Sequence, residues 1–123
     1  MRETKATAKT FAKSINKRAI VLLNGPMGAG KTTFVSQVIK HLDPRIAVTS
    51  PTFTIINQYS DKIYHIDLYR IENTNELKNT NFHEIIAGDN IVFIEWAEKL
   101  NIPGIKVNIN VKEDGTRVFD ITY

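Results

Sequence analysis

The sequence contains no cysteine, so disulfide bonds, cysteine-based zinc sites and cysteine nucleophiles are all excluded. It has no apolar run near the roughly 20 residues that a membrane-spanning helix needs. Residues 1–5 lead into no apolar core of a signal peptide. Blocks of five or six like charges are missing, and a net charge of +3 is mild for a nucleic-acid-binding face. We therefore expect a cytoplasmic protein that does not associate with a membrane.

What the sequence does contain is the composition of an ordinary globular protein. Hydrophobic residues make up 42% and charged residues 24% of the 123 positions. A chain of this length can bury a real core as one unit. We therefore expect a single domain over residues 1–123.

Two continuous apolar runs, residues 19–23 and 91–94, show no alternation with polar residues. Such runs are typical of strands buried on both faces, so we expect them to be partners in a parallel sheet. Helical spacing of apolar residues predicts helices over residues 4–17 and 33–42. The second helix should end before Pro44, because proline cannot continue the backbone hydrogen bonds.

Two further pairs of segments predict β-hairpins. The first pair covers residues 53–59 and 63–66, and the second covers residues 106–111 and 116–121. The second pair alternates apolar and polar residues around an Asp-Gly turn, which is a strong hairpin signal. The shorter elements that we expect are a strand over residues 45–48 and helices over residues 73–77, capped by Asn73 or Thr74, and 82–87.

A glycine-rich loop lies between the first predicted strand and the helix after it. Its fixed residues, Gly25, Gly30, Lys31 and Thr32, match the phosphate-binding pattern G-x-x-x-x-G-K-[ST] at every position. Glycines let successive backbone N–H groups point at phosphate oxygens, and the helix that follows offers its own free N–H groups. The alternative is a glycine turn that merely precedes a helix, but strand, loop and helix all agree with a nucleotide site.

The remaining loop residues fit the same function. Lys31 supplies a charge for the β and γ phosphates, and the Thr32 hydroxyl is a ligand for Mg²⁺. Gly28 and Ala29 keep side chains out of the cradle. Thr33 is either a second ligand or an ordinary hydroxyl in a helical turn. The order of this strand, loop and helix, with the elements above, predicts an α/β protein: a mixed sheet with flanking helices and a C-terminal β-hairpin.

Two acids follow apolar strands and are candidates for catalysis. Glu95 comes directly after residues 91–94, and Asp67 after residues 63–66. A P-loop enzyme needs a carboxylate at a strand end for the Mg²⁺ shell and a group that orients the attacking water. The alternative for each is an exposed acid at the end of a strand.

Other polar residues remain open to two interpretations. His65 is either a general base or a structural histidine, and Arg70 is either an arginine finger or a salt-bridge partner. Trp96 is expected in the core. The hydroxyl-rich segment 50–54 is either a switch that senses the γ phosphate or ordinary turn chemistry.

Four stretches together resemble one family, the TsaE (formerly YjeE) ATPases of tRNA threonylcarbamoyladenosine biosynthesis. They are G-P-M-G-A-G-K-T-T-F from Gly25, S-P-T-F-T from Ser50, Y-H-I-D-L-Y-R from Tyr64 and I-E-W from Ile94. Many NTPases share the first stretch, whereas the other three in this order are far more specific.

The resemblance implies a compact P-loop NTPase-like fold and a function for the whole chain. It implies an ATPase that uses ATP and Mg²⁺, and that supports modification of the adenosine beside the anticodon in tRNAs reading ANN codons. It implies action through a complex of the TsaD and TsaB proteins, with tRNA contacted indirectly. A small-molecule kinase and a nucleotide-binding adaptor without a hydrolytic role are the alternatives. A kinase should carry an Arg-rich lid between Asp67 and Glu95, and an adaptor should lack both acids.

The resemblance also carries roles over to individual residues. Thr32 and Glu95 would hold Mg²⁺, Asp67 would act in hydrolysis, and Trp96 would lie near the nucleotide or the partner. The nucleotide-binding residues would be Thr4, Gly25, Met27, Gly28, Ala29, Gly30, Lys31, Thr32 and Thr33. Pro26 and Met27 depart from the family, which often has an acid and Leu there, and proline removes one backbone donor. Arg117 either approaches the adenine or is a surface residue of a strand.

Overall fold

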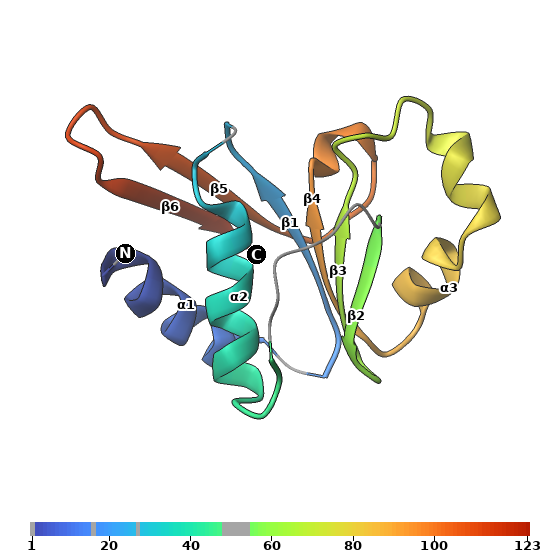
Figure 1. Cartoon of the computed structure of the whole chain (residues 1–123), viewed down its shortest axis with the longest axis horizontal. Helices are drawn as coiled ribbons and strands as arrows, with labels where there is room; N and C mark the ends of the chain where they lie inside the picture. The colour runs from blue at the N-terminus through green and yellow to red at the C-terminus, as the bar shows by residue number, and fades with distance from the viewer. Residues whose placement is uncertain (1, 16, 27, 48–54) are drawn as a thin grey trace.

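The computed structural model describes residues 2–15, 17–26, 28–47 and 55–123. Its strands are β1 (Ala19–Asn24), β2 (Ile56–Ser60), β3 (Ile63–Asp67), β4 (Ile91–Glu95), β5 (Ile105–Val111) and β6 (Arg117–Thr122). Its α-helices are α1 (Arg2–Ser14), α2 (Lys31–Leu42) and α3 (Phe82–Ala87), and its 3-10 helices are η1 (Thr74–Asn79) and η2 (Ala97–Lys99). Figure 1 shows these elements arranged around one sheet.

All six strands form a single mixed sheet in the order β2-β3-β4-β1-β5-β6. The four central strands are parallel, because β1 pairs in parallel with β4 and β5, and β3 pairs in parallel with β4. The two edge strands, β2 and β6, are antiparallel to their neighbours. The carboxyl ends of β1, β3 and β4 therefore meet along one edge of the sheet.

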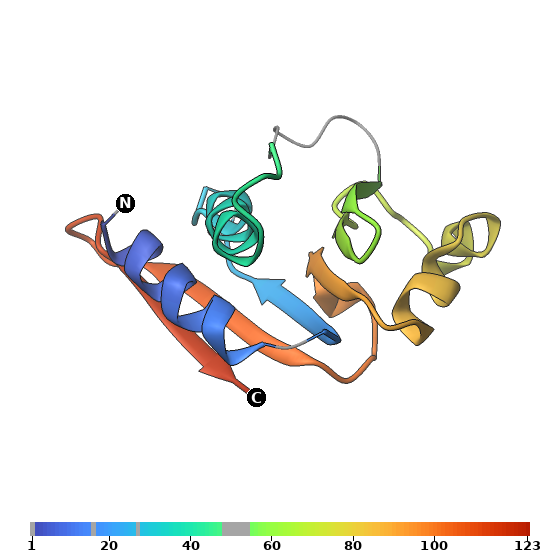
Figure 2. The same ribbon diagram turned by 90° about the horizontal axis from the view of Figure 1, so that it is seen from below.

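The sheet has a hydrophobic core on each face. Helices α1 and α2 cover one face, where Phe11 and Phe34 pack with Phe93 of β4. The elements η1 and α3 cover the other face, where Leu77 and Phe82 lie in a second apolar cluster. In Figure 2, α1 and α2 lie in the left half of the view and α3 lies at the right. Burial on both faces explains why β1 and β4 are continuous apolar runs.

The main sequence predictions of the fold are confirmed. The runs around Val21 and Phe93 are adjacent parallel strands, with these two residues paired in register. Both predicted hairpins form, as β2–β3 and β5–β6. Asn73 is the N-cap of η1, where its side chain accepts from the backbone N–H of Asn75 in a capping box with Glu76.

The strand expected over residues 45–48 is wrong for residues 45–47, and residue 48 lies outside the described residues. The chain turns there, because the Asp43 carboxylate accepts hydrogen bonds from both the backbone N–H and the guanidinium of Arg45. Such a local side-chain contact holds the backbone in a turn. Three bounds of the two long helices also differ from the prediction. The first is the start of α1, which is Arg2 and not residue 4. The helix α1 ends at Ser14, whose hydroxyl donates back to the Phe11 carbonyl, and α2 begins at Lys31, directly after the left-handed Gly30.

Within the described ranges, none of the helices combines the length and the apolar character that crossing a bilayer would require.

Candidate functional site

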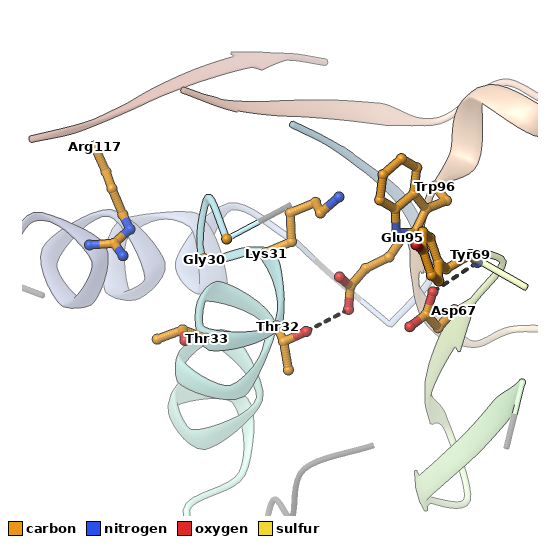
Figure 3. Close-up of a pocket in the computed structure, with 10 residues that line it drawn as sticks. Gly30, Lys31, Thr32, Thr33, Asp67, Tyr69, Glu95, Trp96 and Arg117 are labelled. Carbon is orange, nitrogen blue, oxygen red and sulfur yellow. Dashed lines mark hydrogen bonds between the residues drawn. The ribbon is translucent and has the colours of Figure 1, made fainter. Parts of the chain in front are cut away.

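A pocket lies where the carboxyl ends of β3 and β4 face the N-terminus of α2 (Figure 3). Its volume is about 400 Å³. The lining residues are Gly28, Gly30, Lys31, Thr32, Thr33, Asp67, Tyr69, Glu95, Trp96 and Arg117. Ligands of open α/β sheets bind at this kind of edge, beyond the carboxyl ends of the strands. The phosphate loop, both predicted acids and Trp96 therefore meet at one place, although they come from distant parts of the chain.

The loop between β1 and α2 needs glycine at two positions for different reasons. Gly25 has φ 151°, and a Cβ there would lie 2.5 Å from the Ile109 carbonyl oxygen on β5. Gly30 has φ 95° and is the N-cap of α2, a conformation that residues with a side chain rarely adopt. The first N–H groups of α2 have no partner within the helix, so they are available to an anion at the pocket.

The ammonium group of Lys31 lies beside the phosphate loop and lines the pocket. Its side chain is only 6% exposed, and its Nζ donates a 2.8 Å hydrogen bond to the Gly25 carbonyl. The same ammonium lies 3.9 Å from the centre of the Trp96 ring, a cation–π distance. Both partners are neutral, so neither compensates the positive charge of Lys31. That charge is therefore available to an anionic group in the pocket.

Glu95 is the buried acid of the site. It is 4% exposed, and its Oε2 accepts a 3.0 Å hydrogen bond from the Thr32 hydroxyl. The Nε2 atom of His65 lies 2.5 Å from the same oxygen. Burial by itself raises the pKa of Glu95, but the contacts with His65, Thr32 and the charge of Lys31 outweigh burial and hold that pKa below its usual range. An ionised carboxylate only accepts hydrogen bonds, so His65 is the donor of this contact.

Asp67 lies beside Glu95, because the two residues are register partners at the ends of β3 and β4. Its Oδ1 accepts a 3.0 Å hydrogen bond from the Tyr69 backbone N–H, and the Leu68 N–H donates to the Glu95 carbonyl. Unlike Glu95, Asp67 is only partly buried and opens into the pocket (Figure 3). The site thus has one enclosed carboxylate near Thr32 and one that water can reach.

Lys99 holds the loop after Asp67 in place, and the sequence analysis missed it. Its Nζ donates to the carbonyls of Leu68, Tyr69 and Ile71 at 2.8, 2.8 and 2.7 Å. The Tyr69 ring lies against Trp96, with centroids 5.1 Å apart, and Trp96 has a left-handed φ of 61°. No local pattern marks Lys99, because its role depends on β3 and β4 being neighbours.

Arg117 reaches the phosphate loop from β6. Its Nε donates a 3.0 Å hydrogen bond to the Ala29 carbonyl, and a Cβ on Gly30 would lie 2.9 Å from the same nitrogen. Arg117 is half-buried and lines the pocket, and its approach to the adenine stays a prediction. Trp96, expected in the core, is half-buried and also lines the pocket.

The remaining predicted residues fall into three groups. Thr33 lines the pocket, whereas Ala29 turns its side chain into the core. Thr4 is fully buried on α1, does not line the pocket, and its hydroxyl has no hydrogen-bond partner among the described residues. Its proposed contact with the nucleotide therefore stays a prediction. Met27 and the hydroxyl-rich segment 50–54 lie outside the described residues.

Comparisons with known proteins show the family of this chain. The family model described as threonylcarbamoyl adenosine biosynthesis protein TsaE matches residues 1–119. The chain belongs to the TsaE family. A Rickettsia felis protein named tRNA threonylcarbamoyladenosine biosynthesis protein TsaE is 40% identical over 97% of this chain and 74% of its own length. A Bacillus subtilis protein of the same name is 36% identical over 98% of this chain and 78% of its own length.

A solved structure extends the likeness to three dimensions. The crystal structure of YdiB from Bacillus subtilis superposes with a TM-score of 0.71 and 31% sequence identity. The match covers 94% of this chain and 75% of that one. The mixed sheet with flanking helices is therefore a P-loop-like α/β fold shared with a relative.

The site of this TsaE-family chain fits a triphosphate with Mg²⁺. Thr32 and the ionised Glu95 are hard oxygen donors within hydrogen-bond distance of each other, and Asp67 is a further carboxylate nearby. Mg²⁺ sites commonly use one or two such protein oxygens, with phosphates and water completing the shell. The left-handed Gly30, the start of α2 and Lys31 form the cationic side of the same pocket.

Proposed function

We propose that this chain is a Mg²⁺-dependent ATPase that serves the formation of threonylcarbamoyladenosine in tRNA. The observation that carries the proposal is the contact between Thr32 and Glu95, beside Asp67. It joins the end of a phosphate loop to a strand-end acid, which is the arrangement that P-loop hydrolases use for the metal and the water. The names of the relatives support the role in tRNA.

Each residue has a part in this reaction. The loop N–H groups and Lys31 hold the phosphates, and release of Lys31 from the Gly25 carbonyl frees its ammonium for them. Thr32 and Glu95 would hold the Mg²⁺, and the bound ion would supply positive charge that offsets the negative charge of the phosphates. Asp67 faces the pocket and orients the attacking water, whose oxygen bonds to the γ phosphorus as the bond to ADP breaks.

The chain acts in the cytoplasm with partner proteins. We propose that TsaD and TsaB are these partners, that they contact tRNA directly, and that this chain meets tRNA only through them. Hydrolysis by the chain alone is weak, and the complete assembly uses it for turnover. The surface around Tyr69, which is 49% exposed beside the pocket, is available for such a contact.

A phosphate-release assay tests the proposal. The purified chain is incubated with ATP and Mg²⁺, with and without the TsaD–TsaB pair and tRNA, and modified adenosine in the tRNA is measured in parallel. We expect phosphate release to rise with the partners and modification to require the chain. Lys31→Ala serves as the control without nucleotide binding.

Two results would contradict the proposal. Hydrolysis that ignores the partners while a metabolite becomes phosphorylated would favour a small-molecule kinase. Against that outcome, Arg70 is the sole arginine between Asp67 and Glu95, so an Arg-rich lid is missing from the sequence. Full modification of tRNA by Asp67→Ala and Glu95→Gln variants that no longer hydrolyse ATP would instead favour an adaptor.

A further inference from the structure

His65 is a buried polar residue on an otherwise apolar face of the sheet. It is 1% exposed, and Ile63 on β3 and Phe93 on β4 belong to the core cluster of this face. His65 pairs in register with Phe93, two residues before the Asp67–Glu95 pair. Because side chains alternate along a strand, His65 and Glu95 point to the same face, toward α2. The sequence left His65 open between a general base and a structural histidine.

The contacts of His65 exclude direct action on a substrate. It does not line the pocket, and its Nε2 ends on Glu95 at 2.5 Å. A general base has to reach the proton that it takes, directly or through one water. His65 instead stands behind Glu95, on the side away from the pocket.

Two donors converge on one atom of Glu95. Among the described residues, the hydrogen bonds to this carboxylate come from Thr32 and His65, and both end on Oε2. One donor belongs to α2 and the other to β3, so together they fix the rotation of the carboxylate between two elements. Removal of one partner from a buried charge costs more than the hydrogen bond itself, because the charge is left without compensation.

We propose that His65 is a positioning residue that holds Glu95 ready for the metal, and this inference rests on the proposed Mg²⁺-dependent function. A residue behind a metal ligand sets the ligand's orientation, and its loss typically weakens metal affinity or activity about 10–100-fold. His65 therefore acts through Glu95 and does not touch the nucleotide.

A matched pair of substitutions tests the inference. His65→Gln places an amide N–H near the position of Nε2, whereas the shorter His65→Asn does not reach Glu95 and keeps a polar side chain. Fluorescence of Trp96, the single tryptophan, reports nucleotide binding beside Lys31 at a series of Mg²⁺ concentrations. We expect His65→Asn to raise the Mg²⁺ concentration for half-saturation at least tenfold and His65→Gln to restore most of it. ATP binding without Mg²⁺ should be unchanged in both.

A second pair of variants keeps the test decisive if His65→Asn is less stable. In the Glu95→Gln background, His65→Asn should have no further effect on Mg²⁺ half-saturation, because the residue through which His65 acts is already altered. Thermal unfolding followed by circular dichroism identifies the folded variants. An unchanged Mg²⁺ dependence in folded His65→Asn would overturn the inference, and so would an equal effect of His65→Asn with and without Glu95.

The failure of this inference differs from failure of the proposed function. If wild-type protein binds nucleotide in a Mg²⁺-dependent manner and the His65 variants match it, only the positioning role is wrong. If wild-type binding ignores Mg²⁺, the proposed hydrolase itself is wrong.

Discussion

At the scale of single residues, the two acids of the site differ in their exposure and in their hydrogen-bond partners. Glu95 is enclosed by Thr32 and His65, while Asp67 is partly exposed and held through the Tyr69 backbone. Acids in such different environments are suited to different tasks, one to a fixed metal shell and one to water. The shared register position of the two residues keeps them side by side, as the proposed function requires.

Asp67→Ala should separate binding from turnover. The variant keeps the phosphate loop, so its dissociation constant for ATP should stay within about threefold of wild type. Its kcat should fall about 10²–10⁴-fold, because general acid–base groups typically contribute that much. Lys31→Ala should show the opposite pattern and lose nucleotide binding. Equilibrium binding and phosphate release measure the two quantities, and normal turnover by Asp67→Ala would refute its role.

Glu95 should make the stability of the nucleotide-free protein depend on pH. Its pKa is lowered in the folded state, so its ionised form stabilises the fold above the unfolded pKa of about 4.3. That contribution should be lost as pH falls through the lower folded pKa. Urea unfolding of wild type and Glu95→Gln between pH 7 and pH 3.5 measures it. We expect the wild type to lose more stability than the variant below about pH 5, and equal losses would contradict the assignment.

At the scale of elements, the phosphate loop is supported by the C-terminal hairpin. The Ile109 carbonyl of β5 lies close to Gly25, and Arg117 of β6 donates to the Ala29 carbonyl. The loop therefore rests on two strands that come late in the chain. In the proposed function, a support of this kind would keep the loop N–H groups in position before a phosphate binds and so reduce the cost of ordering them.

The turn after β3 depends in the same way on η2. Lys99→Met keeps a long apolar stem but removes the three hydrogen bonds to Leu68, Tyr69 and Ile71. We expect kcat to fall about tenfold with ATP binding unchanged, because Asp67 at the start of this turn is less well placed. Hydrogen exchange of the amides of residues 68–71 should become faster.

Lys9→Met is the matched control for Lys99→Met, since it removes one positive charge from the exposed side of α1. It should leave both kcat and amide exchange in the turn at their wild-type values. Equal behaviour of the two variants would show that the Lys99 contacts do not position the site.

At the scale of the whole molecule, the strand order assembles the site. Placing β4 between β3 and β1 brings Glu95 next to Asp67 on one side and next to Leu23, just before the phosphate loop, on the other. The two cores then hold this edge from both faces, with α2 packed on α1 and α3 on η1. The pocket therefore lies at a sheet edge that is packed on both faces, with Lys31 and Thr32 presented by α2.

The local features of this protein were determined by its sequence alone. Gly30-Lys31-Thr32 between an apolar run and a helical pattern predicts the phosphate loop, and continuous apolar runs predict buried parallel strands, because these signals act over short distances. Only the tertiary structure decided the long-range contacts. Three contacts depend on strand order and register, which no short stretch encodes. They are the contact of Lys99 with the turn after Asp67, that of Arg117 with Ala29, and that of His65 with Glu95. The strand predicted over residues 45–48 was wrong at residues 45–47 for a different and local reason, since the contact between Asp43 and Arg45 overrode a weak strand pattern.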